Sequence, residues 1–565
     1  METNQPAPPP AAKPSLAVRI GWLALILATV YVCYFSHLGA IGLVGPDEPR
    51  YAGIARAMVE TSDWVTPRLY GKPWFEKPPL YYWGAALSFK LFGVSEAAAR
   101  LPSAVSALLA TLALAWLALR LYGAETARWL LLLLPTTVGM VGFSHAAATD
   151  MPFSGMFTIA MVAAAALVRL VPPERSPVCS AADSVPQSSS SFAPFTSSAY
   201  FAAIVFGFFL GLAVLAKGPA GIILCGGGVS LWALITRRWR EALRLLHPAG
   251  FAAFCVTALP WYILCAQRNP DFFHVFIIEH NFKRFLTPEF QHLQPFWFYA
   301  EIILFAFLPW TAALLWALVV GLGRLRQTRR LSEFTCFLLC WAGFCVVFFT
   351  ISRSKLPGYI LPAVPAIGLI LSRSAVSLTS SKHRSFGLAS LAAAILFAGL
   401  AMKVFDGRLL KNLIAFAPLF ALILGALALA NGLFGIFFLL SRRNIALFAG
   451  ILPILLLFTL VDEILPFTPV SILSSRYLAY QLQANHVPLA DLRVSGIRRS
   501  TLYGLNFYLR TDLQEWDHDP SRESYVLATG RLPCSKIPEV MSCFDLWGPV
   551  DKIDDFELLH LIPKH

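Results

Sequence analysis

The sequence predicts a polytopic α-helical membrane protein with a small soluble α/β domain at its C-terminal end. The chain is 57% hydrophobic and only 14% charged. Apolar runs of about twenty residues, the length that crosses a bilayer as a helix, recur along it. After Pro466 the charged residues become more frequent and the apolar runs shorter. These three observations define a membrane domain over residues 16–466 and a separate domain over residues 467–565.

The apolar runs predict about thirteen transmembrane helices, counted with a length of roughly twenty residues each. They begin near Leu16, Leu101, Ala127, Met151, Ala199, Ala220, Ala249, Phe296, Phe334, Pro357, Phe386, Leu413 and Ile445. The apolar run 80–93 is too short to cross. We expect it to form a helix at the membrane interface, with Tyr81, Tyr82 and Trp83 along an aromatic edge.

The positions of Lys and Arg predict the orientation, because short cationic loops stay in the cytoplasm. Clusters at 237–240, 324–330, 382–384 and 442–443 follow the sixth, eighth, tenth and twelfth spans. The N-terminus is therefore expected in the cytoplasm. The long first loop, 45–100, and the C-terminal domain then lie on the opposite face, which is the periplasm if the membrane is a bacterial inner membrane.

Two polar segments are expected to lie in the cytoplasm, and no function is expected of the second. The Pro-rich tail 1–15 is interpreted as cytoplasmic rather than as a cleaved signal, and the Ser/Pro-rich segment 172–198 as a disordered cytoplasmic loop. The net charge of +13 fits cytoplasmic loops that contact anionic membrane lipids. Because no nucleic-acid-binding module is recognisable, we expect no nucleic-acid partner.

The C-terminal domain shows short strand patterns at 525–529 and 556–562 among helical or turn segments. Eight of the ten cysteines lie in the spans or the cytoplasmic loop, where packing is the default role. Cys534 and Cys543 lie in the exported domain and could form one disulfide there.

Acids beside a cation follow the first span directly, in the stretch that contains Asp47, Glu48 and Arg50. One interpretation is that Asp47 or Glu48 caps a helix that begins near Pro49. The other is catalytic: a partly desolvated carboxylate, held by a nearby cation, serves as a general base or orients a substrate.

Further acids and cations lie in the loops on the same predicted face. Glu76 and Lys77 precede a rigid Pro-Pro turn. Asp150 begins the fourth span, either as a helix cap or as a site residue. Lys217 stands before a helix-breaking Gly-Pro, where an anion can approach. The last members of this set are His280, Arg284, Lys355 and Tyr359. For the cations among them, snorkelling to the interface is the alternative.

Together these residues place a few acids among several cations at a membrane surface. The cations are Arg50, Lys77, Lys217, Arg284 and Lys355. A polyprenyl phosphate would keep its tail between the spans while its phosphate meets such cations through charge-assisted hydrogen bonds. If the lipid carries a sugar, its phosphate is the leaving group, and cations that stabilise the growing charge accelerate its departure.

Three motifs of the first loop carry a family resemblance: DEPRY at 47–51, DWVTP at 63–67 and FEKPPL at 75–80. With them the chain resembles the bacterial polyprenyl-phosphate-dependent glycosyltransferases of the GT-C class. It looks most like the 4-amino-4-deoxy-L-arabinose lipid A transferases, which are related to protein O-mannosyltransferases. The resemblance covers nearly the whole chain, including the KGP motif at 217–219 and SKLPGY at 354–359.

The resemblance implies roles for individual residues. Asp47, with Glu48 beside it, would supply the catalytic or acceptor-orienting carboxylate, and Asp150 matches the second acid. The residues implied on the lipid-phosphate donor are Arg50, Tyr51, Lys77, Lys217, Arg284, Lys355 and Tyr359. Glu76 and His280 match a divalent metal site, for zinc or for a harder ion such as magnesium or manganese.

The implied reaction is a single inverting displacement at the anomeric carbon of the sugar. The expected donor is a sugar on undecaprenyl phosphate, and the expected acceptor is lipid A in the periplasm. A protein O-mannosyl-type or cell-wall glycan transferase stays open, because the loops do not reveal the acceptor pocket. A transporter fits less well, because the charges lie in loops on one face and no internal repeat is evident.

Overall fold

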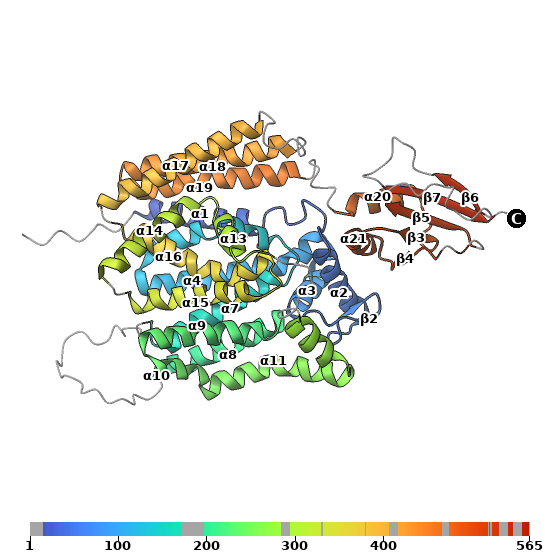
Figure 1. The fold of residues 1–565 in the computed structure, drawn as a ribbon, viewed down its shortest axis with the longest axis horizontal. Helices are drawn as coiled ribbons and strands as arrows, with labels where there is room; N and C mark the ends of the chain where they lie inside the picture. Colours follow the sequence, from blue (N-terminus) through green and yellow to red (C-terminus); the bar gives the residue numbers. More distant parts are fainter. Residues whose placement is uncertain are drawn as a thin grey trace, which may run out of the picture.

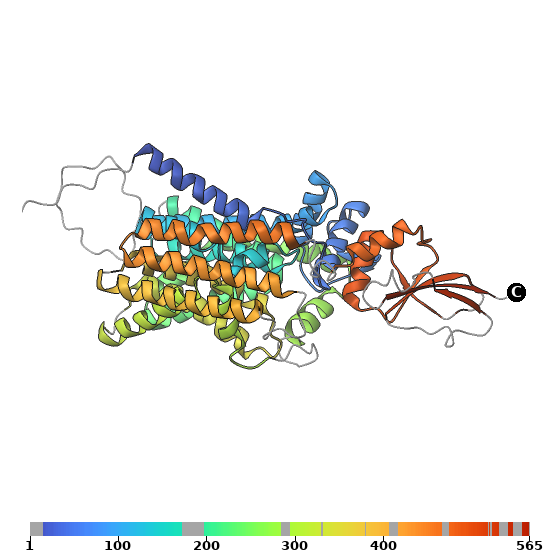
Figure 2. The ribbon, with the colours of Figure 1, turned by 90° about the horizontal axis from the view of Figure 1, so that it is seen from above.

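The computed structural model describes most of the chain. The described residues are 15–171, 197–283, 294–328, 331–378, 380–405, 416–465, 474–517, 519, 522–529, 541–545 and 556–563. Residues 1–14 of the predicted tail and 172–196 of the predicted loop lie outside them, as do Arg284 and Cys534 and the side chains of His280 and Cys543. The molecule is elongated, with a helical bundle and a small α/β domain at one end of that bundle (Figures 1 and 2).

All thirteen predicted spans correspond to apolar helices or helix pairs. In the described residues, ten helices are long and apolar enough to cross a membrane. They are α1 (Leu16–Tyr34), α4 (Glu96–Tyr122), α7 (Asp150–Leu167), α8 (Ser197–Lys217), α11 (Pro248–Arg268), α15 (Glu333–Ile351), η3 with α16 (Pro357–Ala363 and Val364–Val376), α17 (Ser380–Phe405), α18 (Ala417–Leu439) and α19 (Arg443–Ile464).

The other three predicted spans depart from a straight, full-length helix. The pair α5 (Ala124–Leu133) and α6 (Val138–Ser144) bends by 62°, and the pair α13 (Phe298–Ala306) and α14 (Thr311–Thr328) bends by 118°. Helix α9 (Ala220–Thr236) has 17 residues. The short elements α10 (Trp239–Ala242), η1 (Leu243–Leu246) and η2 (His274–Lys283) complete the helices of the bundle.

Small residues allow the helices of the bundle to pack closely. Gly207 and Gly211 lie one turn apart on α8, and a Cβ on Gly207 would stand 2.7 Å from the carbonyl carbon of Gly250 on α11. Two backbones can approach in this way only where side chains are absent, which is the usual packing of membrane helices. Helix α7 is the most enclosed span, with 89% of its apolar window buried. A residue at its N-terminus, such as Asp150, therefore stands on a rigid support.

The first loop folds into four short elements at the end of the bundle next to the C-terminal domain (Figure 1). They are α2 (Asp47–Thr61), the hairpin strands β1 (Arg68–Leu69) and β2 (Lys72–Pro73), and α3 (Leu80–Phe92). The short run 80–93 is a helix, as predicted, but its predicted aromatic edge is wrong. Tyr81 and Tyr82 are fully buried, and the exposed apolar side chains of α3 are Leu87, Leu91 and Phe92.

The C-terminal domain is a five-stranded mixed sheet with two helices. The strands β3 (Leu492–Ser495), β4 (Gln514–Glu515), β5 (Ser524–Thr529), β6 (Met541–Asp545) and β7 (Phe556–Pro563) follow the order β4-β3-β5-β7-β6. Strand β3 is parallel to β4 and β5, and β7 is antiparallel to β5 and β6. The predicted strands 525–529 and 556–562 are β5 and β7.

Helices α20 (Arg476–Ala484) and α21 (Arg499–Leu509) pack their apolar sides against this sheet. Leu482 and Leu505 of the helices share a buried cluster with Leu492, Leu527 and Leu558 of the strands. Because α21 also packs against α2 of the first loop, the domain is in contact with the end of the bundle that carries the predicted site.

Candidate active site

The first group of site residues lies at the start of α2 and just before α3. Arg50 donates from Nη2 to Asp47 Oδ1 at 2.6 Å and lies 3.0 Å from Glu76 Oε2. Lys77 lies 3.8 Å from the other oxygen of Glu76. Helix α2 begins at Asp47, and neither Asp47 nor Glu48 is its cap, so the predicted capping role is wrong. The acids instead occupy the first turn, where the helix dipole favours negative charge.

The second group brings together three segments that are far apart in sequence. Lys217, the last residue of α8, donates to Asp150 Oδ1 at 2.5 Å. The Lys217 ammonium also lies 4.5 Å from the ring centroid of Tyr359. The chain passes so close to Asp150 at Gly358 that a Cβ there would stand 2.5 Å from Oδ1. Asp150 begins α7 but makes no side-chain cap hydrogen bond, so its carboxylate serves the ion pair instead.

The two groups are close enough to act on one another electrostatically. Desolvation by the surrounding protein raises the pKa of the half-exposed Asp47 above its ordinary value. Arg50 and Lys77 oppose that shift, whereas the negative charges of Glu76 and Asp150 reinforce it. The predicted residues of both groups thus form one mixed-charge site.

Lys355 is a buried cation in the loop before η3. It is 8% exposed, and within the described part of the chain no acid forms an ion pair with it. The neighbouring Ser354 is 3% exposed, and its hydroxyl has no hydrogen-bond partner among the described residues. A buried charge and a buried hydroxyl are costly without partners, so this loop is suited to an anion.

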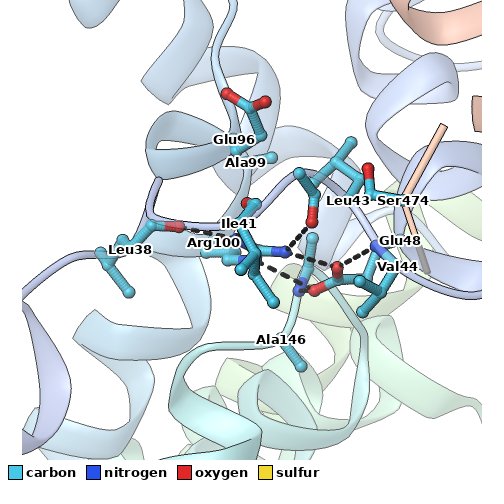
Figure 3. Close-up of polar contacts among 12 residues, drawn as sticks. Leu38, Ile41, Leu43, Val44, Glu48, Glu96, Ala99, Arg100, Ala146 and Ser474 are labelled. Atoms are coloured by element: carbon cyan, nitrogen blue, oxygen red, sulfur yellow. Dashed lines mark hydrogen bonds and ion pairs between the residues drawn. The ribbon is translucent and has the colours of Figure 1, made fainter. Parts of the chain in front are cut away.

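Glu48 lies behind the site, and its carboxylate is fully engaged (Figure 3). Its two oxygens form an ion pair with Arg100 at 2.7 and 3.1 Å. They also accept hydrogen bonds from the amides of Val44 and Ala147, at 2.8 and 2.7 Å. The Ala147 bond ties the start of α2 to the segment that leads to Asp150, so the ion pair sets the spacing of the two groups.

Arg100 is a site-supporting residue that sequence reasoning missed. Its guanidinium donates to Glu48 and to the carbonyls of Leu38, Ile41 and Gly42 (Figure 3). The residue is 2% exposed. The sequence did contain a sign of this role. Arg100 directly precedes the apolar run that begins at Leu101, and a charged residue at the end of a membrane span needs an oppositely charged or polar partner.

Aromatic rings surround Arg50. The guanidinium carbon lies 5.0 Å from the ring centroid of Tyr51, 5.6 Å from Trp74 and 5.9 Å from Tyr503. Tyr51, a predicted donor contact, is 3% exposed and packs between Tyr81 and Tyr82. It therefore lines the inner side of the site, under Arg50.

A cavity of about 570 Å³ opens beside Glu76. It is lined by Trp74, Phe75 and Glu76 of the first loop and by residues at the end of α11, among them Arg268 and Asp271. Aromatic walls with a few charged groups are typical of small-molecule sites.

The predicted metal site is only partly covered by the described residues. They contain no group of three His, Cys, Asp or Glu side chains that could hold one. The predicted ligand Glu76 is engaged by Arg50 and Lys77, and the side chain of the other, His280, lies outside the described residues, as does the predicted donor contact Arg284.

The fold and this site define a class. The chain is a polytopic helical membrane protein that shares its fold with solved ArnT structures, and its acid-and-cation site lies at the end of the bundle beside a small α/β domain. Its structure matches that of ArnT from Cupriavidus metallidurans bound to undecaprenyl phosphate with a TM-score of 0.76, covering 96% of this chain and 98% of that one at 24% identity. The apo ArnT structure gives a TM-score of 0.75 at 23% identity.

Sequence comparison leads to particular relatives. Residues 20–276 match the family described as dolichyl-phosphate-mannose-protein mannosyltransferase. The undecaprenyl phosphate-alpha-4-amino-4-deoxy-L-arabinose arabinosyl transferase of Aeromonas salmonicida (strain A449) is 32% identical over 355 residues, which are 62% of this chain and 60% of that protein. The corresponding transferase of Enterobacter sp. (strain 638) is 29% identical over 371 residues, 66% and 61% of the two chains. The matched region thus spans about 60% of the length of these relatives, and the chain is similar to both groups of transferases over part of its length.

Proposed function

We propose that the protein is an inverting glycosyltransferase that moves a sugar from a polyprenyl phosphate to an acceptor. Undecaprenyl phosphate is the proposed carrier, 4-amino-4-deoxy-L-arabinose the sugar and a lipid A phosphate the acceptor. The observation that carries this proposal is the pair of acids, Asp47 and Asp150, each held by a cation, with Lys355, a buried cation that has no ion-pair partner among the described residues, in a neighbouring loop. Relatives named for this donor sugar support its identity.

In the proposed reaction an acceptor oxygen attacks the anomeric carbon while the bond from that carbon to the phosphate oxygen breaks. The bonding electron pair leaves with the phosphate. Arg50, Lys77, Lys217 and Lys355 would bind the phosphate and stabilise its growing charge. Asp47 would orient the acceptor on the opposite side of the sugar, and would take the proton if the acceptor is a hydroxyl.

Asp47 is assigned the chemical role rather than Glu48, because the oxygens of Glu48 already have four donors. Asp47, by contrast, is half-exposed and bonded on one oxygen to Arg50. Asp150 is assigned to hold Lys217 towards the phosphate and, through its charge, to support Asp47 as a base.

The experiment is mass spectrometry of lipid A from Gram-negative cells that make the aminoarabinose donor but lack their own transferase. Cells with the intact chain should add a pentosamine to lipid A phosphate. Asp47→Asn should abolish the addition while purified protein still binds undecaprenyl phosphate. Glu60→Gln, an exposed acid at the other end of α2, is the matched control and should retain activity.

Retained turnover in the Asp47→Asn protein would remove Asp47 from the chemistry. No addition by the intact chain, with the protein present in the membrane, would remove this donor–acceptor pair.

A second candidate is transfer of mannose from a polyprenyl phosphate to protein hydroxyls, which is favoured by the family match over residues 20–276. A Ser or Thr hydroxyl needs a true base, whereas a lipid A phosphate is already anionic and needs only positioning. Incubating purified protein with polyprenyl-phosphate mannose and Ser/Thr peptides, followed by peptide mass measurement, separates the two acceptors.

The divalent metal stays a prediction. Exhaustive chelation of the purified enzyme tests it, because transfer that falls on chelation and returns with zinc, magnesium or manganese would establish a requirement.

A further inference from the structure

Among the described residues, the C-terminal domain contacts α2, the segment just before it and the site residue Arg50. Arg56 on α2 donates to the carbonyls of Phe507 and Asn506 at 2.5 and 3.5 Å. Phe507 is 6% exposed and belongs to the same buried cluster as Tyr51, Tyr81 and Tyr82. Helix α21 is therefore packed into the core of the first loop.

The second contact is with the segment 39–44, just before α2. Tyr508 accepts a hydrogen bond from the Leu43 amide at 2.7 Å and donates to Glu96 at 3.1 Å. Arg476 donates to the carbonyls of Gly39 and Ala40 at 3.2 and 3.0 Å. Val44 forms an isolated β-bridge with Ser474. These bonds fix the orientation of α21 relative to the first loop.

The third contact reaches the site itself. Tyr503 lies four residues before Phe507, one turn along α21, and its ring centroid lies 5.9 Å from the Arg50 guanidinium carbon. Its ring is also tilted against Tyr70 of the β1–β2 hairpin, with the centroids 6.2 Å apart. The two other rings around Arg50, those of Tyr51 and Trp74, come from the first loop.

The Arg50 guanidinium depends on this enclosure. Its Nε is buried and has no hydrogen-bond partner among the described residues, and Nη2 is shared between Asp47 and Glu76. Ring faces attract a guanidinium without consuming its N–H donors, so they can hold the group while leaving donors for a ligand.

We propose that Tyr503 is a positioning residue of the donor site, through which the C-terminal domain holds Arg50 in place for the lipid phosphate. This inference rests on the role of Arg50 in the proposed function. It makes the C-terminal domain a part of the site.

The test is the kinetics of purified full-length variants with the undecaprenyl-phosphate sugar donor. Tyr503→Leu should lower kcat/KM for the donor about 5- to 30-fold, the range expected from a partly desolvated cation–π contact. Tyr503→Phe should stay near wild type because it keeps the ring face. Tyr480→Leu, an exposed tyrosine on α20, is the matched control and should have no effect.

A double-mutant cycle separates positioning from general destabilisation. If Tyr503 acts through Arg50, Tyr503→Leu should cause little further loss in an Arg50→Gln protein. The melting temperature of Tyr503→Leu should stay near wild type, in contrast to that of Phe507→Ala, which removes a buried ring. Additive losses in the cycle, or unchanged kinetics of Tyr503→Leu, would overturn the proposal.

The same variants are assayed for binding of undecaprenyl phosphate alone. This assay distinguishes failure of the proposed function from failure of the proposed role of Tyr503. If the intact chain binds this lipid but transfers no sugar, the proposed function fails and the binding cycle still decides the role of Tyr503. If the intact chain does not bind the lipid, both proposals fall.

Discussion

At the residue scale, the raised pKa of Asp47 controls when this carboxylate is charged. Desolvation raises the pKa, and the cations Arg50 and Lys77 limit the rise. Because Asp47 must be deprotonated to take the proton of a hydroxyl acceptor, transfer to such an acceptor should fall on acidification at a higher pH than an ordinary aspartate would give.

Arg50→Gln gives a directional test of this electrostatic balance. Removal of the cation should raise the pKa of Asp47 further and shift the acidic limb of the kcat profile to higher pH, beyond its effect on donor binding. The profile is measured at saturating donor. A limb that stays in place or moves to lower pH would contradict the role of Asp47 as the titrating group.

Of the ion pair between Glu48 and Arg100, the sequence analysis singled out Glu48 but not Arg100. The position of Glu48 in the first loop could be recognised from its motif, but its partner lies 52 residues away. No local pattern specifies such a pairing, so the acid was grouped with Asp47. In the structure, the side chains of Glu48 and Asp47 have different partners, because consecutive residues of a helix face different directions.

Breaking this pair should unfold the first loop rather than alter its chemistry. Arg100→Met or Glu48→Leu should each cost about 3–5 kcal/mol, because each leaves an uncompensated buried charge. The double variant should be less unstable than the sum of the two predicts. Thermal unfolding in detergent measures this, and a small loss in each single variant would show that the pair is dispensable.

At the element scale, the positions of the spans could be predicted from the sequence. Which side of a helix is buried against its neighbours could not. Thirteen apolar runs gave thirteen helices or helix pairs, because length and apolarity are local properties. The side of α3 that carries Tyr81 and Tyr82 was misassigned, because burial depends on which neighbours pack there. An aromatic edge looks the same in sequence whether it faces headgroups or the tyrosine of another helix.

The start of η3 offers a test of site geometry. At Gly358 a Cβ would stand 2.5 Å from Asp150 Oδ1 and 2.9 Å from Phe143. Gly358→Ala should therefore displace the Asp150 carboxylate from Lys217 and lower kcat/KM about tenfold to hundredfold, because small misplacements in a site are costly.

Gly343→Ala is the control for this change, because a Cβ at that position of α15 meets nothing within 4 Å. Both variants are compared in transfer activity and melting temperature. Equal activities would show that the close approach at Gly358 does not serve the site.

At the scale of the whole molecule, the motif-bearing loops gather at one end of the bundle, beside the C-terminal domain (Figure 2). The sequence predicted this gathering through charge asymmetry and span count. It did not predict which residues of the last hundred touch the first loop, because contacts such as Leu43 to Tyr508 join positions 465 residues apart.

The shared end should face the periplasm. Alkaline phosphatase fused after the C-terminus should be active in cells, and a fusion that ends within the cationic segment 237–240 should be inactive. The reverse pattern would invert the proposed orientation.

The segment 39–44 is held from the bundle side by Arg100 and from the other side by Arg476 and Tyr508. During synthesis the ribosome makes this segment among the first and its second set of partners among the last. For nearly the entire time of translation and membrane insertion, the start of α2 must therefore exist without half of its supports. A chain that stops before α20 therefore has a membrane domain but lacks these contacts with the segment 39–44.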